Sequence, residues 1–374
     1  GKPLNALPYF ATLGHHAPAQ YNPADYIMDL INSDPVIKES LKEEYIRNKK
    51  SPQLISRQYL IKEPNNRRNG PSTITIDDDD TELGSKWPTG FMEQYLVLFR
   101  RSLKLSIKDQ FTWLNVIQAL FVSIITGLCW LRMPFTESKI PDRTSFVFFV
   151  MIFWPSQTLF AGLMSFPSER SIIARERASG SYRLSAYFLA KSSSEAPLKL
   201  VLPTMFMIIS YWMANINPFF PTFLAFLALE LVAILVAESI GLFIGASVQN
   251  LKQAFVVAVL ALLSFMLVGG FFIQILPHWL GVWAKWLSFF KYAFDACLRL
   301  EFSGNHLYQC EGGTFIDACR QPNATTFVGQ DSLKYLKVDL GIGENFIVLF
   351  AMLIGFRFLA YISLRFVKDN NGRN

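Results

Sequence analysis

Six apolar runs follow one another after residue 110, and each is long enough to cross a bilayer as a helix. They cover residues 111–131, 145–166, 196–214, 219–248, 254–275 and 344–366. A helix rises about 1.5 Å per residue, so about 20 apolar residues span the hydrocarbon layer. Only 17% of the residues are charged, whereas about 25% are charged in a soluble domain. The sequence therefore predicts an all-α membrane protein with six transmembrane helices.

The polar first part of the chain is expected to lie outside the bilayer. Residues 36–88 should form a helical segment and a flexible linker, because the later part of this range is rich in Asp, Asn and Arg. Residues 89–110 should form an amphipathic helix on the cytoplasmic leaflet. The membrane domain, 111–366, and a short cytoplasmic tail, 367–374, follow. Because the chain does not start with Met, we expect it to be the later portion of a longer polypeptide.

Basic residues mark one side of the membrane. They precede the first run, lie in the loop 168–191, and lie at or after the end of the last run. These residues are Arg100, Arg101, Lys104, Lys108, Arg170, Arg175, Arg177, Arg183, Lys191, Arg365, Lys368 and Arg373. Lys and Arg are enriched in cytoplasmic loops, so we expect both termini and this loop in the cytoplasm. The net charge of +6 is explained in the same way, and no nucleic-acid partner is expected.

The loop 276–343 is predicted to lie on the other side. It carries Cys310 and Cys319 close together, and a glycosylation sequon begins at Asn323. Disulfides and N-glycans both belong to oxidising, non-cytoplasmic compartments, so the two signals support each other. We therefore predict a Cys310–Cys319 disulfide and a glycan on Asn323. The Trp- and Phe-rich segment 276–302 should form short interfacial or re-entrant helices on this side, without a further crossing.

Some ionisable residues lie inside the runs. Glu230 and Glu238 are about two helical turns apart in the fourth run, and Arg357 lies in the last. A charge in hydrocarbon costs several kcal/mol (~3 on insertion scales), so such residues are usually paired or functional. We expect Glu230 to hydrogen-bond to a neighbouring helix and Arg357 to be paired or to snorkel.

Motifs for catalysis are not found. The chain contains no G-x-x-x-x-G-K-[ST] phosphate loop, and no serine lies in a recognisable nucleophile turn. Its four histidines show no metal-ligand spacing with the cysteines. We therefore predict no catalytic residue and no metal site in this chain.

Four blocks of sequence resemble, in order and spacing, the G subfamily of ABC transporters. They read YNPADYIMDL, RERASGSYRLSAYFLAK with APLKLVLP after it, WLSFFKYAFDACLRLEF and IGFRFLAYISLRF. The resemblance covers nearly the whole chain apart from the linker 65–86. It implies that residues 1–35 end a nucleotide-binding domain that holds ATP and Mg²⁺ upstream, with neither bound by this chain alone. It also implies a homo- or heterodimer of half-transporters that exports lipids, sterols or amphipathic molecules by alternating access.

The resemblance also assigns residues. Residues 172–185 match the coupling helix that rests on the nucleotide-binding domain, and Glu169 matches an acidic position in polar contact with the amphipathic helix 89–109. The implied coupling residues are Glu169, Arg175, Arg177, Gly180, Tyr182 and Arg183. The implied lining of the substrate cavity is Trp154, Gln157, Val259, Leu263 and Met266, with Phe271 and Phe272 as a plug above it.

Two other functions fit the same topology. The chain could be an ATP-independent channel or structural membrane protein of the same fold, or a stand-alone permease subunit that recruits a separate ATPase. An upstream phosphate loop and Walker B glutamate would separate the exporter from the first alternative. A start codon near residue 1 would support the second. The expected location is the plasma membrane or an endomembrane.

The predicted disulfide gives a direct test of the loop placement. Mass spectrometry of the non-reduced protein should find a peptide that joins Cys310 to Cys319, because an oxidising compartment keeps such pairs bonded. Free thiols at both positions, in protein taken from the cell surface, would contradict the placement of loop 276–343.

Overall fold

The chain divides into two units, Gly1–Glu82 and Leu83–Asn374, and the helices described below belong to the second. A few isolated residues before residue 89 are described. Beyond them, the computed structural model describes 89–178, 181–273, 277–281, 283–303, 307–311, 316–320, 325–338 and 340–366. The predicted regions 1–35, 36–88 and 367–374 fall almost wholly outside the described residues.

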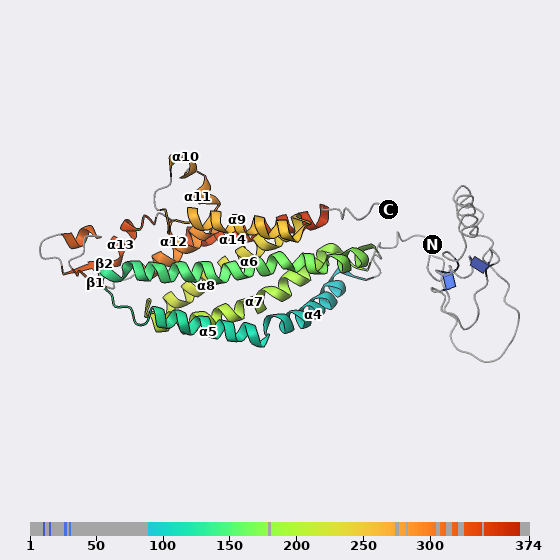
Figure 1. Ribbon diagram of the computed structural model, residues 1–374, viewed down its shortest axis with the longest axis horizontal. Coiled ribbons are helices and arrows are strands. Elements are labelled where there is room, and N and C mark those ends of the chain that lie inside the picture. The colour runs from blue at the N-terminus through green and yellow to red at the C-terminus, as the bar shows by residue number, and fades with distance from the viewer. Residues whose placement is uncertain are drawn as a thin grey trace. The chain divides into compact units, whose positions relative to one another are not determined.

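Long helices make up most of the second unit (Figure 1). They are α4 (Phe91–Gln110), α5 (Trp113–Cys129), α6 (Ile140–Ala178), α7 (Leu184–Ala214), α8 (Phe220–Ser247), α9 (Leu251–Val268) and α14 (Ile342–Phe366). Among the described residues, five helices are long and apolar enough to cross a membrane, and α4 and α5, bent by 56°, make up to six. The predicted all-α membrane fold is confirmed.

Helix α8 is the centre of the bundle. It packs most extensively against α6 and α14, and most of its second half is buried. The contact with α6 is close because glycines face carbonyl groups. A Cβ on Gly241 would lie 2.0 Å from the carbonyl oxygen of Leu159, and a Cβ on Gly245 would lie 2.3 Å from that of Leu163. Small residues let helix backbones approach in this way, so α6 and α8 pack as one unit.

Helix α6 is longer than predicted. The sequence suggested a separate coupling helix over 172–185, broken at Gly180, but α6 continues without interruption from Ile140 to Ala178. Pro167 lies inside the helix and does not end it, and the residues after it are mostly good helix formers. Only the last two residues of the expected coupling segment, Leu184 and Ser185, belong to α7.

Short elements cover the end of the bundle that carries the cysteines. They are η2 (Glu137–Lys139), α10 (His278–Gly281), α11 (Ala284–Leu287), α12 (Phe289–Phe302), η3 (Asp317–Arg320), α13 (Gly329–Tyr335) and an antiparallel pair of strands, β1 (Leu307–Gln309) and β2 (Thr326–Val328). Gly270 has a φ of 97°, which ends the fifth apolar run early and turns the chain towards these elements.

The aromatic segment 276–302 was predicted to form short interfacial or re-entrant helices, and only part of it is exposed as an interfacial segment would be. Trp279 and Trp283 on α10 and beside α11 are exposed. Helix α12, in contrast, is buried at every position except Arg299. Its phenylalanines pack against the spans rather than against lipid, because Phe290 and Phe294 lie within aromatic contact distance of Phe148 on α6.

One buried arginine ties this end of the bundle together. Arg143, near the start of α6, forms an ion pair with Glu301 of α12, and both side chains are fully buried. Its guanidinium also donates to the carbonyl oxygens of Met133 (2.8 Å), Asn215 (3.1 Å) and Ile216 (3.2 Å). Arg143 therefore fastens α12, the α5–α6 connection and the α7–α8 turn to α6.

The close contact between α6 and α8 predicts the effect of a single methyl group. Gly241→Ala should lower the free energy of unfolding in detergent by about 1–3 kcal/mol, because the new Cβ has no room beside Leu159. Gly355→Ala on α14 is the matched control, since a Cβ there meets nothing within 4 Å. Equal melting of the two variants would contradict the close contact.

Candidate coupling site

The candidate site lies at the end of the bundle away from the disulfide, where α4, α6 and α7 meet. Helix α4 packs along α7, with Gln94 and Leu98 buried between them. The Gln94 amide donates to the carbonyl oxygen of Thr89 (3.0 Å) and accepts a bond from the backbone N–H of Arg183 (3.0 Å). Gln94 therefore holds the start of α7 against the start of α4.

Glu176 is the polar centre of this site. Its Oε1 pairs with Arg101 of α4 at 3.1 Å, and its Oε2 accepts a hydrogen bond from the Tyr182 hydroxyl at 2.6 Å. Burial raises the pKa of the Glu176 carboxyl, but the bonds from Tyr182 and Arg101 outweigh it and lower the pKa overall. Burial and Glu176 raise the pKa of Tyr182. Glu176 is therefore ionised and Tyr182 protonated at neutral pH.

Glu169 was predicted to contact the amphipathic helix, and the structure directs its bonds elsewhere. Its Oε1 pairs with Lys191 of α7 at 2.7 Å, and its Oε2 accepts a bond from Tyr187. The ion pair with α4 is made by Glu176 instead, two turns further along the same face of α6. Glu169 does line a small cavity of about 90 Å³ beside Arg101. The sequence identified the correct helix face but not the pairing residue.

The charges continue along α7 at helical spacing. The Lys191 ammonium lies 3.4 Å from one oxygen of the Glu195 carboxylate, and the Lys199 ammonium lies 2.9 Å from the other. Both pairs are i,i+4 neighbours, which face one another on a helix. All three side chains are largely buried. They form a row of alternating sign that leads from the α6–α7 loop into the bundle.

Inside the membrane domain, the row continues to Glu238 of α8 and ends at Arg357 of α14. One Glu238 oxygen pairs with Lys199 at 2.6 Å, and the other pairs with Arg357 of α14 at 2.7 Å. Arg357 also donates to the hydroxyls of Ser192 and Ser239. The prediction that Arg357 is paired therefore agrees with the geometry. We call the six residues from Glu169 to Arg357 the charge row: Glu169, Lys191, Glu195, Lys199, Glu238 and Arg357.

Glu230 differs from the prediction. It was expected to hydrogen-bond to a neighbouring helix, but neither of its oxygens has a hydrogen-bond partner among the described residues. Its side chain is fully buried, as is the thiol of Cys297 on α12. The position of Glu230 within a span, two turns from Glu238, was thus not enough to predict a hydrogen-bond partner.

The other implied coupling residues are placed as follows. Arg175 is exposed on α6, and Tyr182 is buried against Tyr187, with ring centroids 5.7 Å apart. Arg183 is the N-cap residue of α7. The side chain of Arg177 and all of Gly180 lie outside the described residues.

The implied cavity residues divide between an open face and the core. Gln157, Val259 and Leu263 are exposed on α6 and α9, whereas Met266 is half-buried. Trp154 is buried instead, with its ring centroid 5.8 Å from that of Phe206 on α7. Its position on α6 turns it towards α7, while Gln157, about 60° away around the helix, remains outside.

The two phenylalanines of the implied plug lie beside α6. Phe271 is half-buried and stacks on Phe148 with ring centroids 3.9 Å apart. Phe272 is 53% exposed, and its ring meets Phe148 edge-on at 5.2 Å. Both rings therefore lie where α9 ends, and Phe148 fixes their position.

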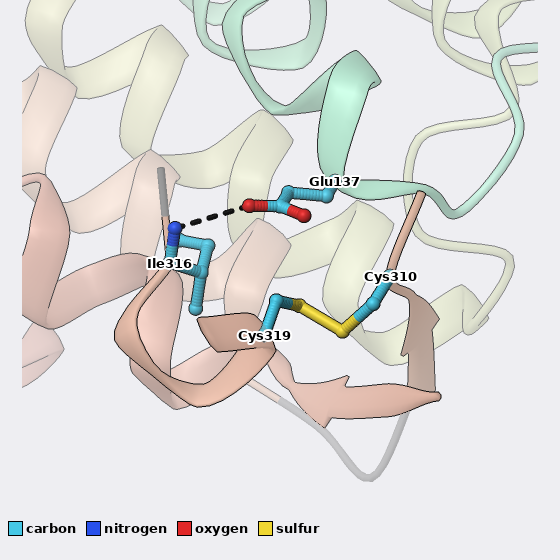
Figure 2. Close-up of a disulfide and its surroundings, with 4 residues drawn as sticks. All are labelled: Glu137, Cys310, Ile316 and Cys319. Atoms are coloured by element: carbon cyan, nitrogen blue, oxygen red, sulfur yellow. Dashed lines mark hydrogen bonds between the residues drawn. A yellow bond between two sulfur atoms is a disulfide. The ribbon is translucent and has the colours of Figure 1, made fainter. Parts of the chain in front are cut away.

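A disulfide joins Cys310 and Cys319 at the opposite end of the bundle (Figure 2). Figure 2 shows Glu137 next to it, accepting a hydrogen bond from the backbone N–H of Ile316 at 3.1 Å. The Glu137 carboxylate and the two sulfurs lie within 4.8 Å of one another, but bonded sulfurs offer no thiolate to a metal. Asn323, the predicted glycan site, lies outside the described residues.

The comparisons with known proteins agree on one family. The model of the ABC-2 type transporter family matches residues 93–302. ABC transporter G family member 14 of Arabidopsis thaliana is 32% identical over 98% of this chain and 56% of its own length. The Arabidopsis G family member 22 is 32% identical over 98% and 48%, and Protein white of Drosophila melanogaster is 26% identical over 98% and 52%. The chain spans about half the length of the curated relatives it matches.

Glu238 pairs with the buried Lys199 and the half-buried Arg357, so its removal should be costly. Glu238→Gln should lower the free energy of unfolding by about 3–5 kcal/mol, because it leaves Lys199 and Arg357 without their shared anion. Glu230→Gln is the matched control on the same helix, since no described partner is lost there. Thermal melts in detergent compare the two, and similar losses would show that the charge row does not hold the helices together.

Proposed function

The chain belongs to the ABC-2 type transporter family and matches the transmembrane portion of its G subfamily, and from this premise we propose that it is the membrane half of an ATP-driven exporter. It is a multi-pass membrane protein. The motor is a nucleotide-binding domain upstream of this chain, which binds ATP and Mg²⁺. Two such halves form a homo- or heterodimer with cytoplasmic termini, in the plasma membrane or an endomembrane.

The charge row is the observation that carries this proposal. An ATP-driven exporter must convert movement at its cytoplasmic face into rearrangement of its spans. Ion pairs at 2.6–3.4 Å link α6, α7, α8 and α14 from the α6–α7 loop inwards. Because a buried charge cannot leave its partner cheaply, a shift of one helix favours a shift of the next.

Helix α6 supplies the second means of transmission. It continues unbroken from Ala178 to Ile140, so it extends about 58 Å at the usual helical rise. Its cytoplasmic end bears Glu176, and Arg143 near its other end holds Glu301 of α12. Movement of the loop would therefore reach the opposite end of the bundle through one helix.

The exposed face of α9 supports an amphipathic substrate and a second half. Only 11% of the apolar window of α9 is buried within the chain. Val259 and Leu263 are exposed on it, and Gln157 is exposed on neighbouring α6. An apolar face with isolated polar groups suits lipids, sterols and amphipathic molecules when a partner subunit closes it.

The proposal is tested by transport in vesicles with the full-length protein. We expect export of at least one member of a panel of phospholipids, sterols and amphipathic compounds, only when ATP and Mg²⁺ are present. Transport at the same rate without ATP would favour the channel alternative and overturn the exporter.

Charge reversal tests the coupling part of the proposal. Arg101→Glu should lower ATP-dependent transport about tenfold, because it places two anions together where α4 meets α6. The double variant Arg101→Glu with Glu176→Arg restores opposite charges and should recover much of the rate. This pair is 58% and 25% exposed, so it adds at most about 1 kcal/mol to stability and the fold should survive.

Arg100→Glu is the control, because Arg100 is exposed on α4 and has no carboxylate partner among the described residues. Equal losses in Arg100→Glu and Arg101→Glu, or no recovery in the double variant, would remove the Arg101–Glu176 pair from the coupling path.

A further inference from the structure

A large pocket lies at the disulfide-bearing end of the bundle, away from the charge row. Its volume is about 1080 Å³, and it is enclosed by the first turns of α6, the residues after α9, α11, α12 and the segment 333–338. Figure 1 shows α10 and α11 projecting beside this end of the bundle. Small-molecule sites usually enclose about 300–1,000 Å³, so the pocket has room for a molecule of lipid or sterol size.

The inner wall of the pocket is apolar and rigid. Phe271 and Phe294 line it, with ring centroids 6.0 Å apart and planes nearly perpendicular. Phe148 stacks on Phe271 from behind at 3.9 Å. Ser288 fixes the start of α12 by donating to the carbonyl oxygen of Phe265 at 2.8 Å. The wall therefore presents a preformed hydrophobic surface.

Positive charge gathers in the same pocket. Among the described residues that line it are four lysines, Lys285, Lys291, Lys334 and Lys337, and one carboxylate, Asp295. Lys291 is neutralised by Asp295 at 2.5 Å, and Lys334 pairs with Asp331 at 3.2 Å.

The other two lysines have no carboxylate partner in the described part of the chain. Lys285 is half-buried, with its ammonium 4.6 Å from the Trp286 ring, and Lys337 is exposed at the rim. An unneutralised cation in a concave, partly apolar site attracts anions more strongly than the same cation on an open surface.

We propose that this pocket binds an amphipathic molecule with a single anionic headgroup, such as a long-chain carboxylate, with Lys285 and Lys337 on the headgroup and Phe271 and Phe294 on the apolar body. A small free anion would leave the apolar wall uncovered, so it is not the preferred ligand. A neutral lipid would leave Lys285 and Lys337 without the anion that they lack among the described residues. Whether the site serves transport rests on the proposed function, but binding itself does not.

Photolabelling of the full-length protein tests this site. The protein is placed in phosphatidylcholine nanodiscs without ATP and labelled with a fatty acid that carries a photoreactive group on its chain. Labelled peptides should come from α12 and the residues that follow α9. Unlabelled hexadecanoate should compete, whereas hexadecanol and inorganic phosphate should not. The proposal would be overturned if hexadecanol competed as well as hexadecanoate, or if phosphate alone competed. Labelling found only outside these segments would overturn it too.

Lysine variants assign the headgroup contact. The double variant Lys285→Gln with Lys337→Gln should weaken labelling by about tenfold or more, because both charge-assisted hydrogen bonds to the headgroup are lost. Lys285→Arg with Lys337→Arg should retain it. Lys252→Gln, at an exposed first-turn position of α9 outside the pocket, is the control.

Unchanged labelling in the glutamine variant would overturn the assignment, provided that the Cys310–Cys319 disulfide shows the end of the bundle to be folded. Because no ATP is used, a failure here leaves the exporter proposal standing. A failure of ATP-driven transport would likewise leave a positive labelling result standing.

Discussion

One carboxylate in the middle of the bundle sets the arrangement of three helices. Glu238 binds Lys199 of α7 with one oxygen and Arg357 of α14 with the other. A buried cation without an anion is costly, so neither α7 nor α14 can leave α8 without losing several kcal/mol (~3–5). Further along α8, Gly241 and Gly245 bring α6 into backbone contact. Helix α8 therefore holds α7 and α14 by charge and α6 by shape.

The two ends of the bundle solve the problem of buried charge in different ways. In the charge row, three anions alternate with three cations, so the row is neutral and each member has a partner. At the disulfide-bearing end, the Arg143 guanidinium pairs with one carboxylate, that of Glu301, and donates hydrogen bonds to several backbone carbonyl oxygens. The first arrangement links side chains on α6, α7, α8 and α14, whereas the second fixes connecting segments to the start of α6. The first therefore joins helices to one another, and the second attaches loops to one helix.

Hydrophobic runs predicted the spans because length and composition decide what can cross a bilayer. The pairing within α7 has a local signal too, since Lys191, Glu195 and Lys199 stand at i,i+4 spacing. The ion pair between Arg143 and Glu301 joins residues 158 apart, and no local pattern reports it. The orientation of Trp154 also depends on which helix lies beside α6. Periodicity gives the face of a helix, but not the neighbour that it meets.

Neutral and unneutralised charges have different consequences for what each end can bind. A row in which every charge is paired within 3.4 Å offers little field to an outside ion, so we do not expect it to attract a charged ligand. Lys285 and Lys337 have no such partner among the described residues, and their field is free to act on a molecule in the pocket. Because Phe148, on α6, backs the pocket wall while Glu176 lies near the other end of the same helix, movement at the loop would change the shape of the pocket. In the proposed transport cycle, the long, unbroken α6 would be the element that connects the charge row to the proposed anion pocket.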